Sequence, residues 1–73
     1  MTKQNDYERQ NQILVERYRP VFESGVSPKE LAEEAALGGE CVIPTILLLR
    51  AYFKMPLADA KKMVYRVRAE VLG

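Results

Sequence analysis

Residues 26–39 read VSPKELAEEAALGG, and this stretch decides the fold. Ser27 is of a residue type that caps helices by accepting a backbone N–H bond, and Glu30 can accept in return from the N–H of the capping residue. Pro28 suits the first helical position, where a missing N–H costs nothing. The closing glycine pair readily takes the left-handed conformation in which helices commonly end. These four signals predict a short helix over residues 28–37.

The segment before this helix predicts another, over about residues 6–19. Apolar side chains recur there near one face at helical spacing, and charged side chains stay off that face. The apolar set is Tyr7, Leu14, Tyr18, Val21 and Phe22. Pro20 lacks an N–H and disfavours helix at the preceding residue, so we expect a stop or kink at Arg19, with room for one more turn before Gly25. Residues 1–5 are expected to be frayed.

Two more helices are predicted after the glycines, over about residues 44–54 and 56–72. The first is apolar nearly all round, which indicates a central position or partial cover by another chain. Residues 41–43 are also compatible with a short strand. The last helix has apolar residues spaced alternately by three and four, as in a helix laid along another helix. They are Leu57, Ala60, Val64, Val67 and Val71, and the cations Lys61, Lys62, Arg66 and Arg68 face away from them.

The chain is therefore predicted to be all-α, a single domain over residues 1–73 formed by a compact array of four short helices. A chain of 73 residues buries only about 60% of its unfolded surface, so regular helix packing or self-association has to supply stability. No apolar run reaches the ~20 residues of a membrane span. Residues 1–12 also lack the apolar segment of a secretory signal. We expect a cytoplasmic protein.

Residues that carry catalysis or bind metals are scarce. The sequence has no histidine, and Cys41 is its only cysteine, which excludes Ser/His and Cys/His catalysis, an internal disulfide and the usual zinc sites. Glu33 and Glu34 are adjacent and point in different directions on a helix. Cys41 is expected to be a buried structural thiol, because Glu40 beside it disfavours a reactive thiolate. We predict that the protein is not an enzyme and needs no cofactor or metal.

Charge is divided unequally along the chain. The net charge is +1, but residues 1–40 hold five basic and eight acidic side chains, whereas residues 41–73 hold six basic and two acidic ones. The halves therefore differ, at −3 and +4. Such asymmetry can steer an acidic partner to the C-terminal half or pair two copies head to tail. The alternative is that the charged side chains only form solvent-exposed faces at opposite ends of the domain.

Residues 27–53 contain a predicted helix, a glycine turn and a second predicted helix, the same order of elements as in a DNA-binding helix-turn-helix. Such motifs read bases with polar side chains at the start of the second helix. Thr45 is the only hydrogen-bonding side chain there, among Cys41, Val42, Ile43, Pro44 and Ile46. These residues cannot match the donor and acceptor pattern of the major groove. Nucleic-acid binding through the basic last helix stays the alternative function.

Two further interpretations concern apolar surface. The last helix could lie on an anionic membrane, although its valine-rich stripe better suits a protein core. An apolar pocket for a metabolite could be lined by Leu47, Leu48, Tyr52 and Val64.

Residues 46–64, ILLLRAYFKMPLADAKKMV, resemble the helix–turn–helix segment in the C-terminal domain of the bacterial ribosomal stalk protein. That family has an apolar helix with an arginine, a short turn, and then Leu-x-Glu-Ala-Lys-x-x-Val. The matching residues are Arg50, Leu57, Ala60, Lys61 and Val64, with Asp59 in place of the glutamate. The resemblance implies two helices that meet near residues 55–56 and dock proteins through Arg50 and Lys61. Lys54 and Pro56 replace the turn glycines, and the rest of that family's fold has no counterpart here.

These observations predict a small non-catalytic protein–protein interaction module, such as a bacterial regulator, inhibitor or immunity-type protein, that associates with itself. Its partner is expected to be a protein, a second copy, or both. The docking surface is expected on the last two predicted helices. The candidate partner-binding residues are Arg50, Lys61, Lys62 and Arg66.

Overall fold

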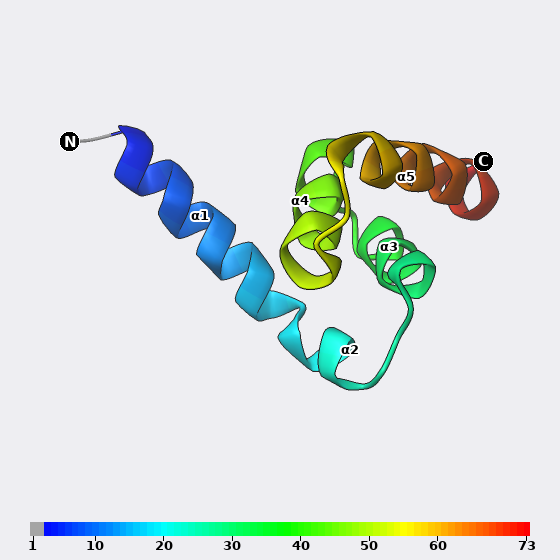
Figure 1. The fold of residues 1–73 in the computed structure, drawn as a ribbon, viewed down its shortest axis with the longest axis horizontal. Coiled ribbons are helices and arrows are strands. Elements are labelled where there is room, and N and C mark those ends of the chain that lie inside the picture. The colour runs from blue at the N-terminus through cyan, green and yellow to red at the C-terminus, as the bar shows by residue number, and fades with distance from the viewer. Residues whose placement is uncertain (1–2) are drawn as a thin grey trace.

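The computed structural model describes the backbone of residues 3–73 and the side chains of residues 9–73, and this part of the chain is helical without strands (Figure 1). Its helices are α1 (Lys3–Arg17), α2 (Arg19–Glu23), α3 (Pro28–Leu37), α4 (Val42–Phe53) and α5 (Leu57–Leu72). The all-α prediction is confirmed. The four predicted helices correspond to α1, α3, α4 and α5, and the further turn expected before Gly25 forms the short helix α2. Residues 3–5 belong to α1, and residues 1–2 lie outside the described part.

The break between α1 and α2 lies at Tyr18, whose φ of −99° and ψ of 5° fall outside the helical region. Pro20 explains the break, because its missing N–H cannot continue the hydrogen-bond ladder of α1. The Tyr18 N–H still donates to the Val15 carbonyl at 3.2 Å, while the Tyr18 carbonyl accepts from Phe22 N–H at 3.0 Å. The chain is thus redirected without losing these backbone bonds.

Helix α3 has the predicted bounds. The Ser27 hydroxyl accepts from the Glu30 N–H at 3.2 Å, and the Glu30 carboxylate accepts from the Ser27 N–H at 2.8 Å, which completes the capping box. Gly39, with a φ of +88°, takes the left-handed conformation after the helix.

Helix α4 begins at Val42, two residues before the prediction, so the strand alternative for residues 41–43 is wrong. Pro44 is the third residue of the helix, which is allowed because no first-turn N–H has a partner inside the helix. Cys41 caps the helix in an extended conformation and is exposed. The prediction of a buried thiol is therefore also wrong, because the capping position lies outside the helical face that packs on the core.

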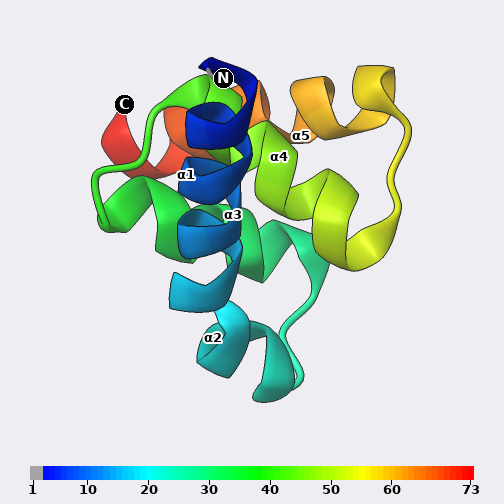
Figure 2. The ribbon, with the colours of Figure 1, turned by 90° about the vertical axis from the view of Figure 1, so that its left-hand side faces the viewer.

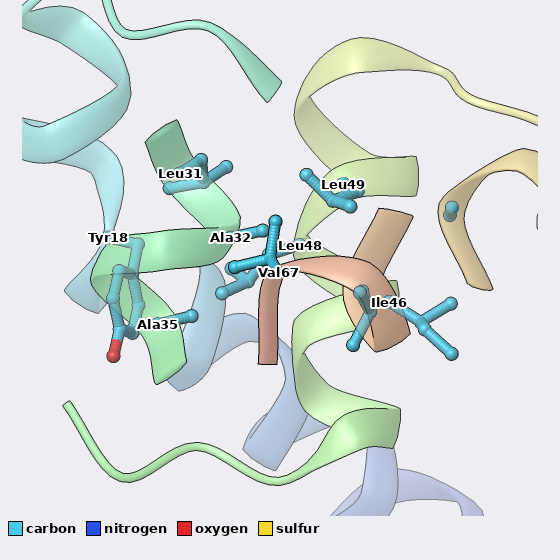
Figure 3. Packing of buried hydrophobic residues seen from close by; sticks show 10 residues of the cluster. Tyr18, Leu31, Ala32, Ala35, Ile46, Leu48, Leu49 and Val67 are labelled. Atoms are coloured by element: carbon cyan, nitrogen blue, oxygen red, sulfur yellow. The ribbon is translucent and has the colours of Figure 1, made fainter. Parts of the chain in front are cut away.

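The core lies between α3, α4 and α5, while α1 packs mainly on α4 and forms an outer layer on one side (Figures 1 and 2). Its N-terminal end points away from the body, and the molecule measures 40 × 23 × 23 Å. The fully buried large side chains come from all three central helices (Figure 3): Leu31, Leu48, Leu49, Val64 and Val67. Alanines at Ala32, Ala35 and Ala60 let these helices approach closely.

The predicted apolar stripe of α5 is largely confirmed. Ala60, Val64 and Val67 are buried and Val71 is half-buried, which places the stripe in the core rather than on a membrane. Leu57, the first residue of the helix, is the exception, at 54% exposed. In residues 3–73, no helix combines the length and the apolar character that crossing a bilayer requires.

Candidate interaction surfaces

Glu40, which follows the glycine turn, holds α1 and α5 in place. Its carboxylate accepts from the Tyr18 hydroxyl at 3.1 Å and from the Arg17 guanidinium at 3.2 Å. Its backbone carbonyl accepts from the Arg68 guanidinium at 2.8 Å. Arg68, predicted to face away with the other cations of α5, is therefore half-buried and has a structural role.

A second set of contacts joins α1 and α2 to α4. The Tyr52 hydroxyl donates to the Val15 carbonyl, and the Tyr52 ring stacks on Phe22 with centroids 4.4 Å apart. Phe53 meets the same Phe22 ring edge-on at 5.3 Å. Loss of solvation raises the pKa of the Tyr52 phenol, and it also raises the pKa of Tyr18, with a further contribution from the Glu40 carboxylate. Both phenols therefore stay protonated over a wide pH range.

These contacts leave an open groove between α1 and the start of α4, with a volume of about 360 Å³. We call it the α1–α4 groove. Its apolar lining is Ile13, Leu14, Ile43, Pro44 and Leu47, and its polar lining includes Arg17 and Glu40. Ile13 is 53% exposed and Ile43 is 69% exposed. The sequence did not reveal this groove, because it depends on the angle at which α1 meets α4.

All four predicted partner-binding residues are exposed, and three of them line two grooves that share one residue. Arg50 lines a shallow groove on α4 with Leu47 and Lys54, while Lys62 and Arg66 line a groove on α5. Met55 lines both grooves, so they adjoin. Lys61 is exposed but is not part of either lining. We call the set Arg50, Lys54, Met55, Lys62 and Arg66 the basic face.

The cations of the basic face are available to a partner. Among the side chains of residues 9–73, ion pairs join Arg17 to Glu40, Arg19 to Glu16 and Lys29 to Glu70, and none involves a cation of the basic face. The groove on α5 also contains Asp59 and the ion pair of Lys29 with Glu70, so its charge is mixed, whereas the groove on α4 contains cations and apolar side chains only.

Sequence reasoning missed Lys54 and Met55, which connect the two grooves. Lys54 has a φ of +58° and a ψ of 31°, the left-handed conformation, and its N–H donates to the Arg50 carbonyl at 3.1 Å. Glycine is the residue that takes this position after a helix at least cost. A cation at a glycine position was the signal that could have identified Lys54.

The structure bears on two other interpretations. Within the described residues, no group of three or more Cys, Asp or Glu side chains is placed to hold a metal ion. Of the four residues considered for a metabolite pocket, Leu47 lines surface grooves, whereas Leu48 and Val64 are completely buried and Tyr52 stacks on Phe22. That set does not surround one common pocket.

Comparison of the chain with protein-family models, with curated proteins and with solved structures finds no match. The resemblance of residues 46–64 to the ribosomal stalk protein stays a prediction from sequence.

Proposed function

We propose that the protein is a small non-catalytic protein–protein interaction module, acting as a regulator, inhibitor or immunity-type protein. It binds an acidic amphipathic helix of a partner through the basic face, and it associates with itself. The observation that carries this proposal is that Met55 lines two grooves whose walls hold four exposed cations, Arg50, Lys54, Lys62 and Arg66. None of these four forms an ion pair with another side chain of residues 9–73.

The chemistry of the basic face matches such a helix in two ways. Arg50 and Arg66 carry planar guanidinium groups, which can each bind a carboxylate through two parallel hydrogen bonds. Met55 and Met63 are half-buried, and flexible thioethers adapt their shape to apolar side chains of different forms. A helix with an apolar face and flanking carboxylates satisfies both kinds of contact at once.

Nucleic acid is the second candidate partner, because the same cations attract phosphates. Two observations favour a protein. Asp59 and Glu70 interrupt the cations of the α5 groove, so the groove offers no continuous run of positive charge to a phosphate backbone. Tyr65 is the one exposed aromatic side chain among the described residues, whereas single-stranded nucleic acids are usually held by several stacked aromatics.

The first test uses a fluorescent synthetic helix of about 18 residues, with leucines at positions i, i+4 and i+7 and glutamates beside them. We expect the double variant Arg50→Glu/Lys62→Glu to bind it at least about tenfold more weakly, because two attractions become repulsions of about 0.5–1 kcal/mol each. Arg9→Glu, at an exposed arginine on α1, is the control for a charge reversal outside the basic face. Fluorescence anisotropy at two salt concentrations measures the binding.

Lys54→Gly separates binding from stability. Glycine should raise the melting temperature by a few degrees, because it relieves the left-handed lysine, yet it should weaken peptide binding because one cation is lost. Lys54→Ala, which keeps the unfavourable conformation, should weaken binding to the same extent without the stabilisation.

Three outcomes would overturn this assignment. One is equal binding by wild-type protein and the double charge variant. Another is equal binding of a peptide whose leucines are replaced by serine, which would leave no role for Met55. The third is tighter binding of duplex or single-stranded DNA than of the peptide, which would favour the nucleic-acid function.

A further inference from the structure

Two large apolar side chains are exposed to solvent in the α1–α4 groove. Ile13 on α1 and Ile43 on α4 are each more than half exposed and line the same groove, together with half-buried Leu14 and Leu47. Scattered single apolar residues on a surface are ordinary, but apolar residues that share one concave lining are typical of an interaction site.

The charges that line the α1–α4 groove differ from those of the basic face, so the two surfaces suit different partners. Its lining holds one cation and one anion, Arg17 and Glu40, paired at 3.2 Å. In a two-fold contact every residue of one copy meets the corresponding surface of the other, so a neutral patch with both signs can satisfy itself. The basic face cannot, because two copies of it would place like charges together.

Helix α1 gives an independent reason to expect added packing at this place. It is 15 residues long and contains nine charged or amide side chains among its first ten residues. Isolated helices of this length are marginal in water and depend on tertiary packing. In one copy that packing comes mainly from α4 and from the contacts near Tyr18, while the N-terminal end of α1 points away from the body (Figure 1).

We propose that the α1–α4 groove binds the same groove of a second copy, forming a two-fold symmetric dimer in which Ile13 and Ile43 of one copy pack against those of the other. The inference rests on the self-association in the proposed function and assigns a surface to it. The basic faces of both copies stay free, so the dimer presents two binding sites for acidic helices.

The test compares matched variants by sedimentation and light scattering over a concentration series. Ile43→Glu and Ile13→Glu should each shift the protein to monomer, because a buried carboxylate in the apolar contact lacks a partner. Leu57→Glu, an equally apolar residue that is 54% exposed and outside the groove, should leave the dimer unchanged. Circular dichroism shows whether each variant keeps its fold, as expected for exposed positions.

Cys41 provides a second, positional measurement. It is the only cysteine, it is exposed, and it lies directly between Glu40 and the first residues of α4 at the groove. A spin label on Cys41 should give a short label-to-label distance in the dimer, and Ile43→Glu should abolish this signal. Sedimentation of the labelled wild-type protein confirms that the label does not itself prevent association.

Each opposite result has a distinct meaning. A dimer that survives Ile43→Glu, or long distances between the Cys41 labels, would overturn the groove as the interface while leaving self-association intact. A wild-type protein that is monomeric at every concentration would overturn self-association as well. Peptide binding at the basic face, measured on that same monomer, would still support the interaction function.

Discussion

Lys54 has a left-handed backbone conformation that is unfavourable for lysine, and its side chain belongs to the basic face. A side chain in the left-handed region costs about 1 kcal/mol, which glycine at the same position avoids. The lysine occurs here at a φ of +58° and contributes its ammonium to the basic face. Unfavourable conformations of this kind concentrate at functional positions, and Lys54 is the residue of the face for which stability and binding should oppose each other.

Tyr18 links residue chemistry to the dependence of stability on pH. Its pKa is raised in the folded protein by lost solvation and by the hydrogen bond to Glu40. The folded state therefore holds the phenolic proton more tightly than the unfolded state. The resulting stabilisation is fully present below the ordinary tyrosine pKa of 10.0 and is lost as the pH rises through the higher folded-state value.

We predict that Tyr18→Phe lowers the free energy of unfolding by about 1 kcal/mol near neutral pH, because one hydrogen bond to a carboxylate is lost. The same variant should show a shallower loss of stability in alkali than the wild type. Urea unfolding between neutral pH and about pH 11 measures both effects. Tyr65→Phe, at an exposed position, should leave the neutral-pH stability unchanged. An equally steep alkaline loss in Tyr18→Phe would contradict the role assigned to this phenol.

At the scale of elements, helix α3 tests whether its capping box works as a reciprocal unit. Ser27→Ala should cost about 1 kcal/mol, because the N–H of Glu30 loses its acceptor. In a double-mutant cycle with Glu30→Ala, the two single losses should sum to more than the double loss, because the two residues hold each other in position. Purely additive losses in urea unfolding would show that the two bonds act separately.

Helix ends were predictable where local chemistry sets them. The serine, proline and glycine signals around α3 act within a few residues of one another, so residues 28–37 could be read from sequence alone. The start of α4 could not, because Pro44 is compatible with any position in a first turn. Its actual start at Val42 is accompanied by the Thr45 hydroxyl donating to the Cys41 carbonyl at 2.8 Å. The break between α1 and α2 was predicted at Arg19 but lies at Tyr18, because Pro20 disfavours helix in the residues before it without fixing the last helical residue.

At the scale of the whole molecule, one small core carries the fold. A domain of this length has a total stability of roughly 4–11 kcal/mol. Leu48→Ala should remove about 3 kcal/mol of it, since Leu48 is completely buried between helices and the cavity cannot refill. Leu57→Ala should change stability by less than about 0.5 kcal/mol, because that side chain is largely exposed. Urea unfolding measures both variants. If the dependence of the unfolding free energy on urea concentration is unchanged, the difference in stability between them arises from the folded core.

The candidate surfaces were predictable only in part, for reasons of geometry. Periodicity along α5 indicated that Lys61, Lys62 and Arg66 face away from the core, and all three are exposed. Periodicity cannot show that Met55 lines both the groove of Arg50 and the groove of Lys62, because this depends on how α4 and α5 meet. The α1–α4 groove likewise depends on a contact between residues far apart in sequence, such as Arg17 and Glu40.

The contacts of Glu40 and Tyr52 hold α1 near its C-terminal end, so a small rotation of the helix there produces a larger displacement at its N-terminal end. At 1.5 Å per residue its 15 residues span about 22 Å, and the contacts that fix its angle lie around Tyr18 and Val15. A rotation of about ten degrees at that end moves the far end by about 4 Å. Small adjustments near Gly38 and Glu40, where the Tyr18 hydroxyl sits, are therefore amplified into a change in the width of the groove.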